Sequence, residues 1–559
     1  MTRAILVWGT WGALTVAGLV FVAWYGRDCP YMDEWGMLPA LTGDEELVSW
    51  LFRPHAEHRY PLPRLVYFGL FRLFGDLRAG MVATTLLLSA SSAGLITLAR
   101  QVRGRTSLAD LFFSVSFLSG GHWENLLMSY QVAFSIPTAL IVTVLILTMW
   151  RPRRGPTAPM EEDAASSAAR VGLVGLAAIL LTGCGNVGLC YAVGVAGWLG
   201  VSGWRCVCGG RFLGAVIAGA GVTAVAAVVG LMAANFPPGP ETGYVAKPID
   251  YVRFALRFAA VSFAPSANWL WPAEGGACML AGGAAWFWVG RGCLKRSVGS
   301  LVGPAAVLLG ATAMVAGMTW GRIWMGLDGA AHSRYAVVLL PGPVAAFLIA
   351  VVVGGRVGCV VPAALAVGAL VAWPINSAIG IENGERLAGF ADCLEVDLHD
   401  GVPSDLIADR YDWQLLVKFP GTPATLNQAA RLRLKTFRGA TPPRPTQSVP
   451  LPFEPNQFLI TLPPSSGAFA LRIRGEYTPK ATSFADYRVR WRDGLAGPWQ
   501  EQRFQVLKCI PFAVVIRVTD ATERIELAPD PGATTYRLTS VELLTAPPVA
   551  GGFPGNAHQ

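Results

Sequence analysis

Long runs of apolar residues recur along the chain from Ala4 to about Asn376 and then stop. A helix needs roughly 20 predominantly apolar residues to cross the hydrocarbon core of a bilayer. The runs therefore predict about eleven membrane spans. They lie near residues 4–24, 79–99, 108–124, 130–150, 170–184, 186–203, 212–234, 277–290, 299–319, 335–354 and 357–376.

One apolar stretch differs from the predicted spans because it is short and carries charge. Residues 65–74 are rich in aromatic side chains, and the surrounding segment from Pro61 to Gly75 also contains Arg64 and Arg72. Two arginines eight residues apart fall on one face of a helix. This pattern predicts a helix that lies in the membrane interface.

The pattern changes after residue 376. Leu387, Phe390, Leu394 and Leu398 recur at spacings of three and four residues, which predicts helix. After a proline-rich linker at 441–445, short alternating runs separated by turn residues are typical of a β-sandwich. We therefore expect a polytopic α-helical membrane domain (1–376, with an external loop at 25–78), an extracytoplasmic helical connector (377–440) and a β-sandwich domain (441–559).

Composition supports this division. The 559 residues are 53% hydrophobic and 14% charged, and the mean hydropathy is +0.45, which indicates an integral membrane protein. The first apolar run is followed by bulky residues from Val22 to Tyr25, without the small residues that signal peptidase needs. We therefore interpret it as a retained span.

The net charge of +8 indicates orientation and not a nucleic-acid partner. The excess arginines and lysines lie in alternate short loops, at 100–105, 151–154, 205–211, 291–296 and 356. By the positive-inside rule these loops and the N-terminus are cytoplasmic. Eleven spans would then place the C-terminal domain outside.

The unusual polar residues gather on the opposite side, at the predicted outer ends of the spans. A shared outward-facing site would explain this, since ionisable groups are costly beside hydrocarbon, whereas the alternative is a set of merely solvated loops. The residues are Asp33, Glu34, His55, Glu57, His58, Arg59, His122, Glu124, Asn125, Gln131, Asn186, Arg322, Asp328, His332 and Arg334.

The cluster from His55 to Arg59 follows the acidic pair in the same external loop. A helical turn after Pro54 would place His55, His58 and Arg59 on one face. Two imidazoles at this spacing could bind a divalent metal ion, with an oxygen ligand from Asp33 or Glu57, but no third ligand follows at a suitable spacing. A hydrogen-bonding or phosphate-facing site is the favoured interpretation.

Two further groups could bind substrate. Arg322 and the sequence His332-Ser-Arg334-Tyr335 suit a phosphodiester at the membrane surface, and the alternative is an interfacial arginine–tyrosine anchor. His122, Glu124 and Gln131, with neighbouring aromatic residues, could line a sugar pocket, although polar contacts between packed helices explain them nearly as well.

The remaining motifs are negative or undecided. The ten cysteines show no zinc or redox spacing, and no phosphate-binding glycine loop follows a predicted strand. Cys393 and Cys509 are the two cysteines of the predicted outer domain. They could pair in an oxidising compartment or remain as two buried thiols.

The order of these features resembles the GT-C superfamily of membrane glycosyltransferases. The resemblance covers residues 1–376 and rests on a first span, a long external loop with the acidic pair Asp33-Glu34, interfacial helices and many further spans. The sequence 55–59 together with Ser333-Arg-Tyr335 is similar to an uncharacterised bacterial branch. The chain departs from better-known branches in carrying His55 and His58.

The resemblance implies a function and a location. A sugar would move from a polyprenyl-phosphate donor to a glycan or other envelope acceptor at the outer face of a bacterial cytoplasmic (inner) membrane, with no certain cofactor. Asp33 would be the general base, Glu34 would orient it or replace it, and Arg59 and Arg334 would hold the departing phosphate.

The alternative is a non-catalytic polysaccharide flippase or polymer-export subunit. A transporter should place its polar residues near the middle of the bilayer and show inverted repeats. This sequence concentrates them at one face and shows no repeat. That contrast favours the enzyme.

Overall fold

A computed structural model describes the chain in fifteen stretches, and it divides into two compact units. The membrane unit is Met1–Asp28 with Gly43–Arg386, and the C-terminal unit is Cys29–Thr42 with Leu387–Gln559. The described residues are 2–55, 59–150, 164–234, 246–264, 270–294, 300–411, 422–440, 447–454, 459–462, 468–478, 484–493, 500–507, 512–519, 522–529 and 535–545.

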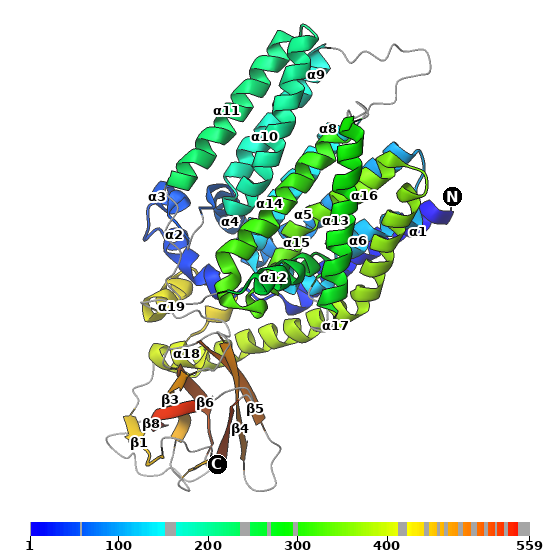
Figure 1. Ribbon diagram of the computed structural model, residues 1–559. Coiled ribbons are helices and arrows are strands. Elements are labelled where there is room, and N and C mark those ends of the chain that lie inside the picture. The colour runs from blue at the N-terminus through cyan, green and yellow to red at the C-terminus, as the bar shows by residue number, and fades with distance from the viewer. Residues whose placement is uncertain are drawn as a thin grey trace, which may run out of the picture. The chain divides into compact units, whose positions relative to one another are not determined.

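Eight helical stretches among the described residues are long and apolar enough to cross a membrane, which is consistent with a membrane protein. They are α1 (Thr2–Tyr25), α5 (Arg78–Arg103), η4 with α8 (Ser129–Gln131 and Val132–Met149), α10 (Gly185–Cys208), α11 (Phe212–Ala234), α14 with η6 (Val302–Arg322 and Ile323–Met325), η8 with α15 and α16 (Ser333–Tyr335, Ala336–Leu339 and Pro341–Val353) and α17 (Val357–His399) (Figure 1). The shorter α9 (Ala164–Thr182) is also apolar, and α13 (Trp271–Leu294) extends beyond the predicted 277–290 at both ends.

The predicted continuous helix over 108–124 is wrong. This stretch contains η2 (Leu108–Asp110), α6 (Leu111–Phe117), η3 (Gly120–His122) and the start of α7 (Trp123–Leu127). The helix ends at Leu118, and Ser119 Oγ accepts a hydrogen bond from the Gly121 amide to begin a new turn. A Cβ at Gly121 would lie 2.6 Å from Cβ of Ala264 and 2.9 Å from Cβ of Asn376, so neighbouring elements approach too closely for a larger residue.

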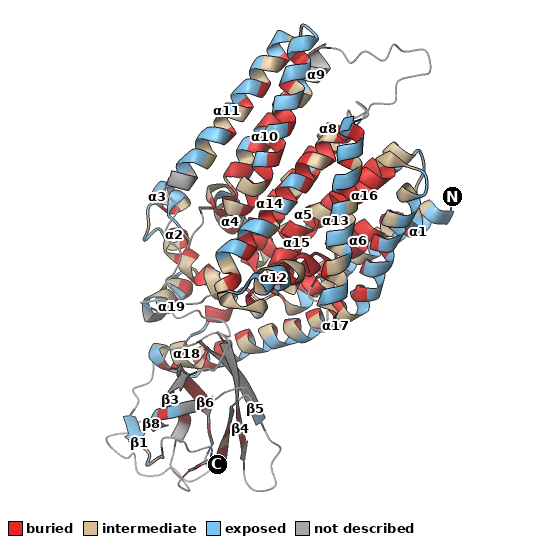
Figure 2. Cartoon of the chain, in the orientation of Figure 1, coloured by how far each residue is buried: buried red, intermediate tan, exposed pale blue. Residues whose placement is uncertain are grey.

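Burial separates central helices from peripheral ones in the membrane unit. Of the 18 most apolar consecutive residues in the stretch Ser333–Val353, 78% are buried, against 17% of the corresponding residues in α1 and 22% in α11. Figure 2 colours the helices by burial. Ile5 on α1 and Leu213 on α11 are exposed although they are large and apolar. Exposed apolar side chains on such helices are what contact with lipid requires.

Small residues let the helices pack closely and reveal their directions. A Cβ at Gly80 on α5 would clash with Ser129 before α8, and one at Gly94 would lie 2.8 Å from Ile146. Both contacts advance in the same sense, so α5 and α8 run parallel. Elsewhere α10 and α14 run antiparallel: Gly194 meets the Ala306 carbonyl, and Gly310 meets Tyr191.

The aromatic stretch forms a helix as expected. α4 (Pro61–Phe74) has proline in its first turn and ends at Gly75, whose φ of 62° is left-handed. Tyr67 and Phe71 are buried together with Arg64, whereas Arg72 is exposed, so the prediction that the two arginines share one face is wrong. The other short helices of the membrane unit are α3 (Leu47–Phe52), α12 (Pro248–Ala260), η5 (Val261–Phe263) and η7 (Leu327–Ala330).

The helical part of the C-terminal unit combines a segment of the first loop with residues from Leu387 onward. It contains η1 (Met32–Met37) and α2 (Leu38–Thr42) from the first loop. It also contains the end of α17, which continues as one helix through residue 376, and then α18 (Ser404–Arg410), α19 (Thr422–Arg431) and η9 (Lys435–Phe437). α2 packs against α19 (Figure 1).

The described residues of the C-terminal unit from 447 onward are mostly β structure, which confirms the predicted change of class. Two antiparallel four-stranded sheets have the strand orders β1-β8-β3-β6 and β2-β7-β4-β5. One hydrophobic cluster contains residues of both sheets, such as Ile473 and Val489; that they form a β-sandwich stays a prediction. The strands are β1 (Gln447–Pro450), β2 (Leu459–Thr461), β3 (Ala468–Thr478), β4 (Phe484–Asp493), β5 (Gln500–Leu507), β6 (Phe512–Arg517), β7 (Thr522–Pro529) and β8 (Thr535–Thr545).

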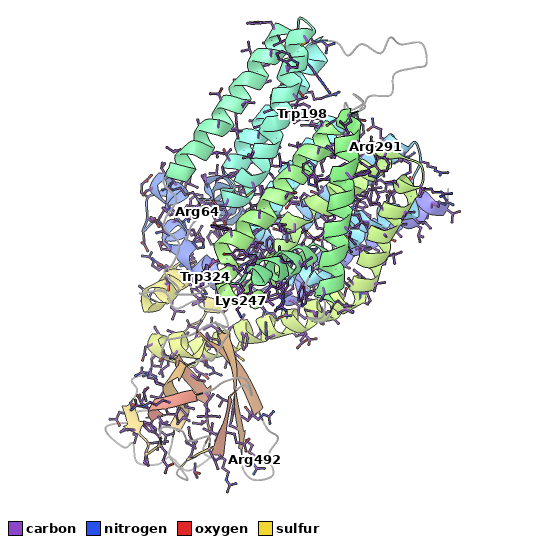
Figure 3. The ribbon with its side chains drawn as sticks, in the orientation of Figure 1. Arg64, Trp198, Lys247, Arg291, Trp324 and Arg492 are labelled. Atoms are coloured by element: carbon purple, nitrogen blue, oxygen red, sulfur yellow. The ribbon has the colours of Figure 1, made fainter. Side chains whose placement is uncertain are left out.

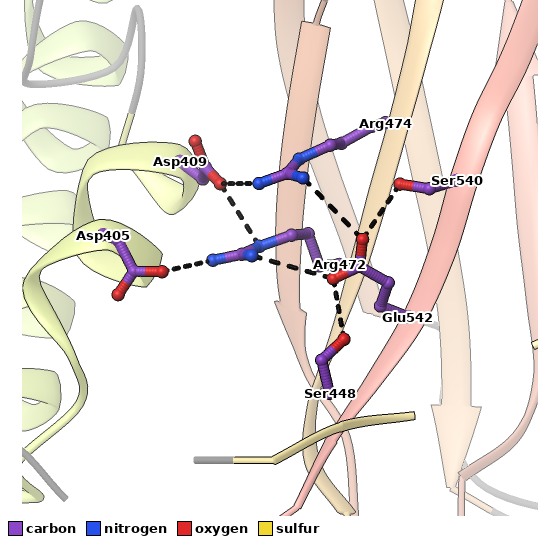
Figure 4. Close-up of polar contacts among 7 residues, drawn as sticks. All are labelled: Asp405, Asp409, Ser448, Arg472, Arg474, Ser540 and Glu542. Carbon is purple, nitrogen blue, oxygen red and sulfur yellow. Dashed lines mark hydrogen bonds and ion pairs between the residues drawn. The ribbon is translucent and has the colours of Figure 1, made fainter. Parts of the chain in front are cut away.

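A charged network joins α18 to the first of these sheets (Figure 4). Arg472 on β3 is nearly buried, and its Nη2 and Nε atoms lie 2.7 Å from Asp405 and 3.2 Å from Asp409 on α18. Glu542 on β8 lies 3.7 Å from Arg472 and accepts a hydrogen bond from Ser448 on β1. Because the guanidinium has carboxylate partners on both elements, α18 completes the environment of a buried charge.

Candidate functional site

The main polar site of the membrane unit joins α7 to η8, more than two hundred residues later in the sequence. Glu124 Oε2 accepts hydrogen bonds from Ser333 Oγ (2.5 Å) and from the Arg334 amide (2.9 Å). Asn125 Nδ2 donates to the carbonyl oxygens of Ser333 (3.2 Å) and Arg334 (3.3 Å). These four bonds fix the backbone turn from which the Arg334 and Tyr335 side chains project.

Two arginines lie beside Tyr335, which is itself nearly buried. Arg322 Nη1 donates a hydrogen bond to the Tyr335 hydroxyl oxygen. The guanidinium carbons of Arg322 and Arg334 lie 5.7 and 5.6 Å from the centroid of its ring, and the His332 ring lies 6.2 Å away. We call Arg322, Arg334 and Tyr335 the arginine–tyrosine cluster. The structure thus brings together three of the residues that the sequence indicated.

The charge of Glu124 is maintained by its neighbours. Burial raises the pKa of Glu124, but the positive charges of Arg334 and His332 and the bonds from residues 333 and 334 outweigh it, so the pKa lies below its usual value. Glu124 is therefore a carboxylate at neutral pH. It serves to orient η8 and is poorly suited to donate a proton.

Two other predicted residues contact their own segments. His122 is fully buried, and its Nε2–H donates to the Ser116 carbonyl. Burial lowers the pKa of His122 to about 4, against the opposite effect of that carbonyl, so the imidazole is neutral. Gln131 is also buried, and its Nε2 contacts Met128 Sδ at 3.0 Å. A role for either residue in a sugar pocket stays a prediction.

Aromatic rings gather around Tyr130, close to the first loop. The rings of His55, Tyr60 and Tyr67 lie 6.2, 6.4 and 5.6 Å from that of Tyr130, all approaching edge-on. Tyr60 and Tyr67 were not among the residues predicted to form the site; Tyr60 directly precedes α4, and Tyr67 lies on it seven positions later.

Arg64 was interpreted from the sequence as an interfacial residue, yet its side chain is fully buried. Its Nη1 donates to the carbonyl oxygens of Trp50 and Arg53, both at 2.5 Å, and more weakly to that of Leu51. The guanidinium also lies 5.3 Å from the centre of the Trp50 ring; Figure 3 labels Arg64 on α4. A cation at these carbonyls caps the C-terminal end of α3 and fixes it against α4.

The acidic pair belongs to the C-terminal unit, in η1. Glu34 is fully buried and its Oε2 accepts a hydrogen bond from the Tyr31 amide (2.9 Å), as in a capping box. Asp33 is half-buried. Glu124 and the arginine–tyrosine cluster belong to the membrane unit, so a single site shared with the acidic pair stays a prediction.

The metal and cysteine predictions fall partly outside the described residues. Among the residues that the structure describes, no group of three or more His, Cys, Asp or Glu is placed to hold a metal ion. Cys393 is an exposed free thiol. Glu57, His58 and Cys509, and the side chain of Asp328, lie outside the described part, whereas Arg59 is described and half-buried.

The arrangement of the membrane unit suits recognition of an anion. Guanidinium groups bind phosphate oxygens in a planar fork and keep their charge at any physiological pH. Glu124 and Asn125 hold the backbone of one of the two arginines, so its position is largely preset.

A scan against protein-family models and a search of curated proteins found no match to the chain.

Proposed function

We propose that the protein is a membrane glycosyltransferase that moves a sugar from a polyprenyl-phosphate donor to an extracytoplasmic glycan or envelope acceptor. The arginine–tyrosine cluster is the observation that supports this most directly. Two guanidinium groups beside one phenol at the ends of apolar helices suit a lipid-linked phosphate, because its charge remains at the membrane surface while its tail enters the bilayer.

The directions of the helices support a count of eleven crossings. α5 and α8 run parallel, so a chain that alternates direction must cross once between them. The segment from residue 104 to Gly120, which contains α6, makes this return. It joins the eight long apolar helices, α9 and α13 to give eleven crossings. An odd number places the N-terminus and the C-terminal domain on opposite sides.

The arginine-rich loops then orient the protein in a bacterial inner membrane. Arg103, Arg291 and Arg356 all lie near the ends of helices that this count brings to the N-terminal side. The arginine–tyrosine cluster, Glu124 and the β-sandwich domain would lie outside. A donor on a polyprenyl phosphate is presented at that outer surface.

The proposed reaction assigns a different task to each charged group. The Asp33 carboxylate takes the proton of an acceptor hydroxyl while that oxygen forms a bond to the anomeric carbon, and the bond from this carbon to the phosphate oxygen breaks. Configuration is inverted. Arg322 and Arg334 stabilise the negative charge that grows on the phosphate.

The different burial of the two acids favours Asp33 as the base. Glu34 is fully buried. Asp33 is half-buried and can meet an acceptor from solvent. Of the two roles considered for Glu34, we therefore assign it the orientation of η1 and not direct catalysis.

A transfer assay tests the proposal. The purified protein is incubated with labelled polyprenyl-phosphate sugars and cell-envelope acceptors, alongside Asp33→Asn. We expect transfer by the wild type and a loss of roughly a hundredfold or more in the variant, which keeps the shape but removes the proton acceptor. Normal turnover in Asp33→Asn and in Glu34→Gln would contradict the mechanism. Movement of an intact lipid-linked glycan without bond cleavage would support the flippase alternative.

A further inference from the structure

We propose that the C-terminal unit positions the acidic pair for catalysis, with Trp35 and Phe437 as the positioning residues. This inference rests on the proposed function, because it concerns the base that the proposed transfer uses. It assigns to the C-terminal part of the chain a task other than glycan binding or passive support.

The first observation is the membership of the acidic segment. Cys29–Thr42 forms a compact unit with Leu387–Gln559, although the two segments lie near opposite ends of the sequence. α2, which directly follows the acidic pair, packs against α19. The segment that carries the acidic pair therefore packs with residues beyond the end of the apolar region.

The second observation is an aromatic anchor two positions after Asp33. Trp35 is 1% exposed, and its ring centroid lies 6.1 Å from that of Phe437 with the planes at 72°. Leu38 and Leu41 are also buried and follow Trp35 at spacings of three residues. One face of η1 and α2 is therefore anchored, while Asp33 keeps part of its surface open to solvent.

η1 cannot hold this position by itself. It is a 3₁₀ helix of six residues, and helices of this kind and length are not stable alone. Its first residue, Met32, has a φ of 50°, a left-handed conformation that is unfavourable for a side chain with a Cβ. Such a backbone persists where surrounding contacts enforce it.

Phe437 is a firm point of attachment because its own position is fixed within the same unit. Its amide donates to the Leu434 carbonyl (2.8 Å), and the side chain is 4% exposed. The next residue, Arg438, accepts a hydrogen bond at its carbonyl from His399 Nε2 (3.0 Å) at the end of α17. Trp35 is thus linked through η9 to α17.

This linkage has a kinetic consequence. A general base must lie within hydrogen-bond reach of the acceptor, and a displacement of about 1 Å can reduce turnover by roughly a hundredfold. The Trp35–Phe437 contact does not touch donor phosphate, so loss of it should change kcat and leave the donor KM nearly unaltered.

The test compares Phe437→Ala with Phe437→Leu and with Ile525→Ala, a control that also shortens a fully buried side chain of the C-terminal unit but lies in β7. Amide hydrogen exchange in segment 29–42 is measured on each full-length protein together with kcat and donor KM. We expect faster exchange in that segment and a fall in kcat of roughly ten- to a hundredfold in Phe437→Ala only. Phe437→Leu should restore much of both.

The outcomes separate the two proposals. Unchanged exchange in segment 29–42 of Phe437→Ala, or an equal loss of kcat in Ile525→Ala, would overturn the positioning role. If Phe437→Ala does not fold, the milder Trp35→Phe is expected to show the same effects at smaller size, and its failure to do so would equally overturn it. A wild type with no transfer activity would refute the proposed function, whereas exchange would still report whether Phe437 holds the segment.

Discussion

Glu124 and Arg334 show how a single residue can contribute its backbone and its side chain to different tasks. The Arg334 amide donates to the Glu124 carboxylate, while the Arg334 guanidinium lies beside the Tyr335 ring. The buried acid therefore acts on the position of the cation through the main chain. Substitutions of the two residues should accordingly have different effects.

Arg334→Lys is expected to retain only part of the transfer activity, and Arg334→Ala much less. Lysine keeps the positive charge but lacks the planar fork that binds two phosphate oxygens. The amide that bonds Glu124 remains in both variants, and lysine also keeps a positive charge near the Glu124 carboxylate, so the lysine variant should preserve the fold, whereas alanine removes that charge and should lower stability as well. Transfer rates with the melting temperature in detergent will show this; equal activity of the lysine variant and the wild type would contradict bidentate binding.

Glu124→Gln is expected to lower stability at neutral pH, by about 1.5–3 kcal/mol, because it removes the charge from buried hydrogen bonds. The lowered pKa of Glu124 means that its carboxylate stabilises the folded state above the unfolded pKa, and that this contribution is lost as pH falls through the folded value. The difference in melting temperature should thus be largest near pH 7 and shrink as pH falls through the lowered pKa of Glu124.

A matched control for this effect is Glu395→Gln on the exposed surface of α17, which should leave the melting temperature unchanged across the same pH range. A difference between wild type and Glu124→Gln that is independent of pH would show that the charge of Glu124 is not what holds η8.

At the scale of elements, Arg64 and Arg72 form a natural comparison because both lie on α4. Arg64 is fully buried against the carbonyls of α3, whereas Arg72 is exposed, with its guanidinium 4.9 Å from the Phe68 ring. We expect Arg64→Ala to cost about 2–5 kcal/mol, since it leaves buried carbonyls without donors. Arg72→Ala should cost about 1 kcal/mol or less.

Thermal unfolding in detergent measures both costs, and limited proteolysis between residues 47 and 60 reports directly on release of α3. Similar stability of the two variants would mean that the contacts of Arg64 do not hold α3 against α4.

Hydropathy located most long helices because it records what a bilayer selects. The predictions 4–24 and 79–99 match α1 and α5 to within a few residues. It was wrong for 108–124 because an average over apolar residues does not register the backbone approach at Gly121. The same averaging hid Arg64, whose charge is satisfied by carbonyls of another helix and not by solvent or lipid headgroups.

The site was predictable in its members but not in its contacts. Glu124, Arg322, Arg334 and Tyr335 stood out because ionisable and aromatic residues are unusual at the ends of apolar runs. The bond from Ser333 to Glu124 joins residues 209 positions apart, and no local pattern indicates such a pairing. The link from Trp35 to Phe437 was missed for the same reason.

For the whole molecule, sidedness is the property on which the proposed function depends. A reporter enzyme that is active only outside the inner membrane should work when fused after Gln559 and fail when fused after Arg154 or Arg296, because the proposed number of crossings is odd and these loops are basic. The opposite result would place the arginine–tyrosine cluster in the cytoplasm and exclude a donor presented at the outer leaflet.

The charged network of Figure 4 predicts which C-terminal fragment is stable. A fragment of residues 440–559 lacks Asp405 and Asp409, so the nearly buried Arg472 loses two of its carboxylate partners. We expect a fragment of residues 387–559 to unfold at clearly higher denaturant concentration. Its free energy of unfolding should be larger by about 3 kcal/mol or more. Circular dichroism of both fragments measures this. Arg472→Met should reduce the difference, and an equal stability of the two fragments would contradict the network.

The composition of the C-terminal unit also sets an order of events during synthesis. The segment Cys29–Thr42 leaves the ribosome early, but its partners from Leu387 onward are made more than three hundred residues later. At about 5–20 residues per second, the acidic segment waits for roughly 20–80 seconds before Phe437 exists. A nascent or truncated chain can therefore insert its helices without an assembled acidic segment, and the proposed base takes its position only after Phe437 has been made.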